Sequence, residues 1–185
     1  MFAKFIETYG AGADVKNIPS GDLDGFRDVL PAELLELVAL GEGSYMNGFL
    51  WIVNPAEYRQ LVNEIYLPVS HPSVCFARDA FGCLYLWEDN SVVYIDINYS
   101  KQEVVGRKLN VFFDLKLTDN SFLEKKTSYK KYLDVKSKLG PLSIDECYGY
   151  ITLLGLGGFD KPENLNKVKL KEYLSIVAQA LGKIQ

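Results

Sequence analysis

The stretch from residue 73 to residue 106 constrains the fold more than any other part of the chain. Its sequence is SVCFARDAFGCLYLWEDNSVVYIDINYSKQEVVG, in which short runs rich in β-branched and aromatic residues alternate with the turn-like segments AFG, EDNS and NYSKQ. Short runs of this kind, separated by turns, are typical of an antiparallel meander. We therefore predict three or four antiparallel strands around residues 73–106.

Helix-like segments precede and follow this meander. Apolar residues recur at helical spacing in each of them. They are FAKFIETY, LPAELLELVAL, PAEYRQLVNEIYL, NSFLEKKTSYKKYLDVKSKL and residues 164–181. Pro31 and the pair Asn54–Pro55 fit helix starts, and Gly41 and the pair Gly140–Pro141 fit helix ends. The predicted fold class is α+β, a twisted antiparallel sheet with helices before and after it.

Several local expectations accompany this fold. We expect residues 10–21 to form a loop and SYMNGFLWIVN to form one strand that Gly48 interrupts. The segment IDECYGYITLLGLGGFD is apolar enough that we expect it in the core, as a helical turn leading to a strand. In the helix after Pro31, the spacing predicts a buried stripe. Its members are Leu34, Leu35, Val38 and Leu40.

The length and composition suit one domain, or one domain with a modest appendage. Of the 185 residues, 48% are hydrophobic and 13% aromatic, which is enough for a substantial core. The longest apolar runs fall well short of the roughly 20 residues that a membrane span needs, and Met1–Tyr9 does not resemble a signal peptide. We therefore expect a cytoplasmic protein without a membrane partner.

Charge is distributed unevenly along the chain. The net charge of −4 argues against general nucleic-acid binding. Residues 1–100 hold fourteen acidic and five basic residues, a net charge of −9, whereas residues 101–140 hold five acidic and ten basic residues, a net charge of +5. Two interpretations of the acidic part stay open, a solvated surface or a surface that attracts a basic partner.

The glycine-rich stretch GEGSYMNGFLWIVNP, residues 41–55, does not fit a phosphate-binding loop. Such a loop needs a strand before the glycines, then a Lys-Ser/Thr pair and a helix behind them. Here the order is reversed, and no lysine lies between Met46 and Asn54. A second cluster, GLGGFD at 155–160, also lacks the lysine. We expect a helix stop, a turn and close backbone packing at these clusters, and no bound cofactor.

Candidate catalytic and metal-binding residues are few. His71 is the single histidine, and no serine has the context of a nucleophile elbow. A zinc site would need His71 with Cys75 and Cys83 at irregular spacing, in runs that suit buried strands. With Cys147 the cysteines number three and show no disulfide framework, so we expect reduced, buried thiols. The sequence predicts no metal site and no enzyme active site.

Several segments, in order, resemble known families. The string LPAELLELVALGEGSYMNGFLWIVNPAEY and the string ARDAFGCLYLWED resemble two elements of the GAD-like domain. The string LGPLSIDECYGYITLLGLGGFDKPENLNKVKLKEYLSIVAQALG resembles the companion C-terminal domain of Tdi-type immunity proteins of type VI secretion. The resemblance covers most of the chain from about Leu30 to Gly182. It implies a GAD-like part over residues 1–108 and a Tdi-type part over 109–185, packed as one compact unit.

The resemblance implies a function in toxin defence. Immunity proteins of this kind bind a cognate toxin effector in the cytoplasm, are encoded beside it, and in the best-known cases oppose DNase effectors. An acidic surface would suit a basic nuclease. We hypothesise that this surface includes five carboxylates. They are Glu88 and Asp89, with Asp22, Asp24 and Glu42 as weaker candidates.

Other interpretations of the same residues stay open. Glu88 and Asp89 lie in the turn composition EDNS, so solvation of a turn and an edge strand is the other interpretation of these two residues. An enzyme of unrecognised type, using carboxylates or His71, is the first alternative function. A general regulatory interaction module, similar to the SMI1/KNR4-like superfamily, is the second. The oligomeric state and the identity of the toxin are not specified by the sequence.

Overall fold

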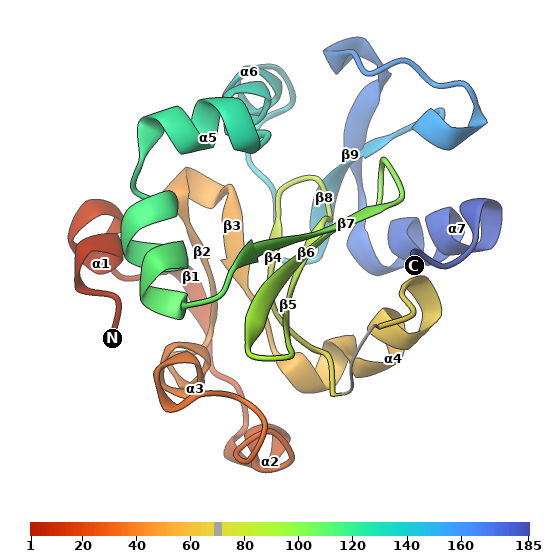
Figure 1. Ribbon diagram of the computed structural model, residues 1–185. Helices are drawn as coiled ribbons and strands as arrows, with labels where there is room; N and C mark the ends of the chain where they lie inside the picture. Colours follow the sequence, from red (N-terminus) through yellow and green to blue (C-terminus); the bar gives the residue numbers. More distant parts are fainter. Residues whose placement is uncertain (69–71) are drawn as a thin grey trace.

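The computed structural model describes residues 1–68 and 72–185 and has the predicted α+β architecture. Seven strands of the described residues form one antiparallel sheet in chain order, and helices flank it on both faces (Figure 1). The strands are β1 (Ala13–Lys16), β2 (Glu42–Tyr45), β3 (Leu50–Ile52), β4 (Val74–Asp79), β5 (Leu84–Glu88), β6 (Ser91–Asp96) and β7 (Lys101–Gly106). The meander predicted around residues 73–106 is therefore confirmed as the four strands β4–β7.

The helices surround the sheet and continue to the C-terminus. They are α1 (Ala3–Tyr9), α2 (Ser20–Asp24), α3 (Ala32–Ala39), α4 (Pro55–Ile65), the π-helical segment η2 (Val111–Lys116), α5 (Asn120–Lys126), α6 (Tyr129–Leu139) and α7 (Leu170–Leu181). Asn54 caps α4, because its Oδ1 accepts a hydrogen bond from the Ala56 N–H at 3.1 Å. Pro55 suits the first helical position because it has no backbone N–H group that would need an acceptor there. The predicted start of this helix is confirmed.

Strand alternation divides the core between the two faces of the sheet. Leu50 and Ile52 of β3 point into one cluster, which the side chains of α1, α3, η2 and α6 complete. Trp51, between them, points into the other cluster, where α4 and α7 pack. Successive side chains of a strand face opposite sides, so a sheet covered on both faces has almost no exposed residue in its central strands. All residues of β3, β4 and β5 are buried accordingly.

The C-terminal part adds a second, two-stranded antiparallel sheet. Its strands are β8 (Glu146–Tyr150) and β9 (Leu165–Lys169), and α7 follows β9 directly. Cys147 and Tyr173 of this part lie in the same core cluster as Trp51, while Tyr148 lies in the cluster on the other face of the main sheet. The C-terminal part therefore contributes side chains to both cores.

The glycine-rich stretch forms a hairpin, which corrects the single strand predicted for SYMNGFLWIVN. Strands β2 and β3 pair with each other through the corner η1 (Met46–Gly48), where φ is positive at all three residues. The Asn47 carbonyl at this corner accepts hydrogen bonds from the Tyr132 hydroxyl and, at 2.7 Å, from Lys136 Nζ. The stretch turns the chain and docks α6, and its helix–strand–strand order differs from that of a phosphate loop.

Other local predictions were wrong in identifiable ways. Residues 10–21 contain β1 and the start of α2, and the helix predicted over 164–181 begins six residues later, after β9. In α3 the buried stripe is Leu34, Leu37 and Val38, whereas Leu35 is half-buried and Leu40 is exposed. The 3.6-residue period places Leu37 on the face of Leu34 and Val38 and turns Leu40 away from it. Residues 146–160 run from strand to 3₁₀ turn, the reverse of the expected order.

Candidate functional site

Two of the five predicted partner-binding carboxylates meet at the start of α4. Glu42 Oε1 accepts a hydrogen bond from the Asn54 N–H at 2.9 Å, and Asp22 Oδ2 accepts one from Asn54 Nδ2 at 2.7 Å. Glu42 is buried, and Asp22 is half-buried. These two carboxylates hold the helix cap in place, a role that charge patterning along the sequence did not indicate.

The other three carboxylates lie apart from that cap. Asp24 is exposed and pairs with Arg27 Nε at 3.0 Å. Glu88, at the end of β5, is buried at 3% exposure near the Tyr66 hydroxyl, and Asp89 follows it in the exposed β5–β6 turn. Asp24 and Asp89 are therefore the two carboxylates of the predicted set that lie open to solvent.

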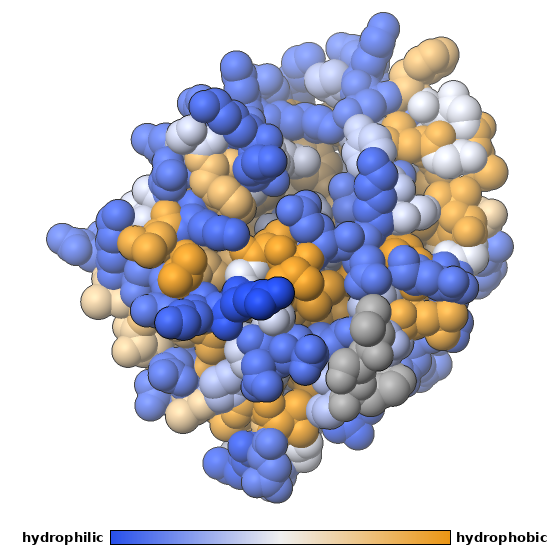
Figure 2. Space-filling view, in the orientation of Figure 1, coloured by the Kyte–Doolittle hydropathy of each residue, from blue (hydrophilic) through white to orange (hydrophobic). Residues whose placement is uncertain are grey.

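A different surface stands out on the C-terminal part. In the described part of the chain, the three most exposed large hydrophobic side chains are Phe159 at 73%, Ile151 at 64% and Leu156 at 61%. All three lie in the segment that joins β8 to β9, residues 151–164, which we call the β8–β9 loop. Figure 2 shows hydrophobic side chains gathered on this side of the molecule. Concentrated exposed apolar area of this kind marks interaction surfaces.

Hydrogen bonds fold the loop back on itself. Asn164 Oδ1 accepts a hydrogen bond from the Thr152 N–H at 3.0 Å, and Asn164 Nδ2 donates hydrogen bonds to the carbonyls of Thr152 and Phe159. Gly158 passes so close to the same turn that a Cβ there would lie 1.9 Å from the Thr152 carbonyl oxygen. The loop therefore displays Phe159 from a fixed backbone, and a glycine at 158 is required for that close approach.

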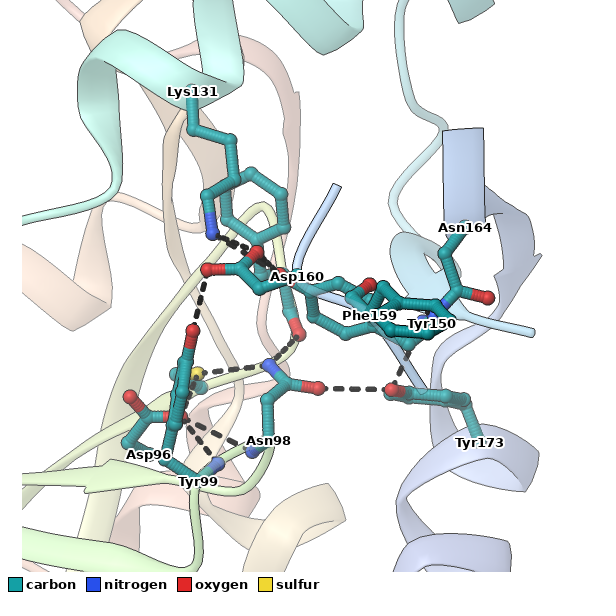
Figure 3. A network of polar contacts seen from close by, with 11 residues as sticks. Asp96, Asn98, Tyr99, Lys131, Tyr150, Phe159, Asp160, Asn164 and Tyr173 are labelled. Atoms are coloured by element: carbon teal, nitrogen blue, oxygen red, sulfur yellow. Dashed lines mark hydrogen bonds and ion pairs between the residues drawn. The ribbon is translucent and has the colours of Figure 1, made fainter. Parts of the chain in front are cut away.

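Asp160 ties the loop to the rest of the protein (Figure 3). Its Oδ1 lies 2.6 Å from Lys131 Nζ of α6 and accepts a hydrogen bond from the Tyr150 hydroxyl at 2.5 Å. Its Oδ2 accepts one from the Tyr99 hydroxyl at 2.5 Å. Burial acts to raise the pKa of Asp160, but these three donors outweigh it and hold the pKa below its ordinary value. The carboxylate is therefore ionised at neutral pH. We call these four residues the Asp160 clamp.

A second set of contacts lies beneath the clamp and joins the same elements. Tyr173 of α7 donates from its hydroxyl to Asn98 Oδ1 at 2.8 Å and accepts the Tyr150 N–H at 3.1 Å (Figure 3). Asn98 in turn donates to the Phe81 carbonyl at 3.2 Å. These buried contacts fix β8 and α7 against the β6–β7 turn, so the base of the loop is held on both sides.

Sequence reasoning missed this surface. The segment was expected in the core because it is apolar, and its glycines were interpreted as a turn with close backbone packing, not as part of an exposed surface. The signal that distinguishes it is the absence of both helical and strand periodicity between Ile151 and Phe159, together with three glycines. A run without periodicity cannot present one apolar face to a core, so some of its side chains face solvent.

All three thiols are free and buried, and burial raises the pKa of each, in Cys147 to about 12, so they stay protonated at neutral pH. No group of three or more His, Cys, Asp or Glu side chains in residues 1–68 and 72–185 is arranged to hold a metal ion. His71, which a zinc site with Cys75 and Cys83 or a histidine-based catalytic site would need, lies outside the described residues.

Within the portion of the chain that the structure covers, no helix combines the length and the apolar composition required to cross a bilayer.

Comparison with known proteins places both parts of the chain. The crystal structure of Atu4351 from Agrobacterium tumefaciens is similar over 97% of this chain and 89% of that one, with a TM-score of 0.77 and 19% sequence identity. No curated protein matches. Residues 1–101 match the GAD-like domain model, and residues 107–180 match the model of the T6SS immunity protein Tdi1, C-terminal. The chain therefore belongs to the GAD-like domain family and carries, after that domain, the C-terminal domain of type VI secretion immunity proteins.

Proposed function

We propose that this protein binds a cognate secreted toxin effector in the cytoplasm and neutralises it by protein–protein contact. The observation that carries this proposal is the match of residues 107–180 to the C-terminal domain of an immunity protein. The β8–β9 loop, which displays Ile151, Leu156 and Phe159 to solvent, offers a contact surface. The loop lies inside the part of the chain that matches the immunity domain. Neutralisation by binding requires a rigid surface with apolar anchors and no reacting group, and this loop supplies such a surface.

A nuclease is the target class that the charge distribution favours. Residues 1–101 hold fourteen acidic and six basic residues, a net charge of −8, whereas residues 107–180 hold nine acidic and thirteen basic residues, a net charge of +4. A nuclease presents a basic surface to the phosphate backbone of the nucleic acid that it cleaves. Long-range attraction between that surface and the acidic part, in which Asp24 and Asp89 are exposed, would speed association.

Co-expression with the effector encoded beside this gene tests the proposal. We expect the effector alone to arrest a bacterial host and the pair to restore growth, and we expect the purified proteins to form a complex. An effector with an inactivated catalytic site serves as the control for expression load. Failure of the wild-type protein both to restore growth and to form the complex would overturn the proposed function.

A titration separates this function from the enzymatic alternative. An inhibitor that acts by binding must be present in at least equimolar amount, because each complex removes one toxin molecule. An enzyme that destroys the toxin or reverses its damage acts far below that ratio. We therefore expect toxin activity to fall linearly with added protein and to reach its minimum near equivalence. Complete protection at a hundredth of the toxin concentration would contradict binding as the mechanism.

A further inference from the structure

The β8–β9 loop combines exposure with rigidity, and the two together are unusual for a surface loop. Phe159 is 73% exposed, yet both of its neighbours are fixed, Gly158 by its packing on Thr152 and Asp160 by the clamp. An exposed apolar side chain on a fixed backbone loses little conformational entropy when a partner covers it. Aromatic residues presented in this way are the usual anchors of protein interfaces.

The charges around the loop are predominantly basic. Lys131 belongs to the clamp, Lys161 follows Asp160 in the chain and is exposed, and Lys101 lies with Nζ 5.8 Å from the centroid of the Tyr99 ring. Lys138 lies 3.8 Å from Glu163 in an exposed pair. Three acidic residues lie among these four lysines: Asp160 and Glu163, which pair with Lys131 and Lys138, and the half-buried Asp96 near Lys131. Lys101 and Lys161 therefore provide the positive charge that a partner would meet.

The acidic carboxylates of the N-terminal part lie elsewhere. Helix α2, which carries Asp22 and ends at Asp24, is at the lower end of the molecule in Figure 1, whereas the β8–β9 loop is at the upper right. The surface that would steer a basic partner and the apolar surface with its lysine rim are therefore separate. A partner that engages both must present two regions of opposite charge.

We propose that the β8–β9 loop is the anchor of the toxin interface and inserts Phe159 into an apolar pocket bordered by carboxylates. This inference rests on the proposed function and adds to it the chemistry of the partner's contact surface. Apolar burial of the ring provides affinity, and the lysine rim selects a partner whose pocket is ringed by acidic groups. The partner is a folded protein, because a rigid anchor of three separate apolar side chains matches a preformed concave surface.

Binding measurements with the purified, catalytically inactivated effector test this inference. We expect Phe159→Ala to raise the dissociation constant by about 30-fold or more, which is the loss of affinity typical of an anchor residue. The matched control is Leu115→Ala, which truncates another exposed apolar side chain, on η2, at 57% exposure. Its affinity should stay within twofold of the wild type. Equal affinities of the two variants would overturn the inference.

The rim is tested by charge reversal. We expect Lys161→Glu to weaken binding by about tenfold and the loss to shrink as salt is raised, because exposed charges are screened. Lys125→Glu, at an exposed site of α5 outside the acidic part, is the control and should bind within twofold of the wild type. An unchanged affinity for Lys161→Glu at low salt would contradict an acidic rim on the partner.

The outcomes separate this inference from the proposed function. If the wild-type protein binds and neutralises the effector while Phe159→Ala does so equally well, the loop is not the anchor and the immunity function stands. If the wild-type protein fails to bind, the proposed function itself is wrong. Gel filtration of the protein alone gives a further check. Self-association that Phe159→Ala abolishes would assign the loop to a contact between copies and overturn its role as the toxin anchor.

Discussion

Lys131 Nζ lies 2.6 Å from Asp160 Oδ1, and this ion pair joins helix α6 to the β8–β9 loop across 29 positions of sequence. The two side chains are 26% and 37% exposed, so the pair is partly shielded from solvent. The hydroxyls of Tyr99 and Tyr150 complete the coordination of the carboxylate from two further elements. The loop that displays Phe159 is therefore held by residues from both the GAD-like and the C-terminal parts.

Removing the lysine from this clamp should loosen the loop without unfolding the protein. We expect Lys131→Met to lower the free energy of unfolding by about 1 kcal/mol, since the pair is only partly shielded. Hydrogen exchange over residues 151–164 should become faster. The control Lys138→Met removes an exposed pair of 3.8 Å with Glu163 and should change neither quantity. Equal exchange in the two variants would show that the clamp does not restrain the loop.

Two adjacent glycines of the loop should respond differently to alanine. At Gly157 φ is +90° and no atom lies within 4 Å of an added Cβ, so Gly157→Ala should cost only about 1 kcal/mol of backbone strain. At Gly158 the added Cβ would meet the Thr152 carbonyl oxygen at 1.9 Å, so the loop must move. We expect Gly158→Ala to cost about 3 kcal/mol in thermal unfolding and to abolish toxin binding. A similar loss in both variants would contradict the close approach.

Asp79 should make stability depend on pH. Burial raises its pKa to about 7 from 3.8, against hydrogen bonds from the Tyr94 hydroxyl and from the N–H groups of Phe81 and Cys83. The folded protein therefore holds a proton that the unfolded chain releases between these values. The resulting stability is present below about pH 3.8 and is lost as the pH rises to about 7, a change of about 4 kcal/mol.

The variant Asp79→Asn isolates this effect. Its amide oxygen can accept both backbone hydrogen bonds at 2.8 and 3.1 Å, and the Tyr94 hydroxyl can rotate to accept from the amide nitrogen. We expect urea unfolding between pH 4 and pH 7 to show a much smaller slope in the variant than in the wild type. Asp96, whose pKa burial also raises, leaves a residual slope in both. Identical slopes would mean that Asp79 is ionised in the folded protein throughout this range.

Charge reversal in the acidic part should slow association with a basic toxin. We expect Asp24→Lys and Asp89→Lys each to reduce the association rate constant by about threefold at low salt and to leave the dissociation rate unchanged. Stopped-flow or surface plasmon resonance measurements give both rate constants. Asp134→Lys makes the same charge change on an exposed site of α6, outside the acidic part, and is the control. If the control slows association as much, the effect is one of net charge alone.

The sequence predicted the elements that have a clear internal period. The meander appeared as β4–β7 and the cap at Asn54 was placed correctly, because alternation and capping are properties of neighbouring residues. Short elements, which contain too few residues to show a period, were misassigned. All four residues of strand β1 are exposed, so its sequence shows no alternation of apolar and polar residues. Strand β9 is followed by α7 without a loop, so no turn residues mark the boundary between them.

The candidate site could not be predicted in the same way. Of the predicted acidic residues, Glu42 and Glu88 are buried, and Asp22 is committed to the cap of α4, because contacts from distant elements close over them. Conversely, Ile151, Leu156 and Phe159 are apolar in sequence but exposed in the fold. Burial depends on which elements pack together, and no count of local charge or hydropathy contains that information.

The sequence by itself determined the α+β class, the meander, the main helices and the family to which the chain belongs. These follow from periodicity, turn chemistry and ordered motifs, all of which act over a few residues. Only the tertiary structure decided that Asp160 meets Lys131, Tyr150 and Tyr99, and that Phe159 is left outside the core. The reason is physical: the clamp joins residues up to 61 positions apart, and its geometry exists only once both sheets have packed.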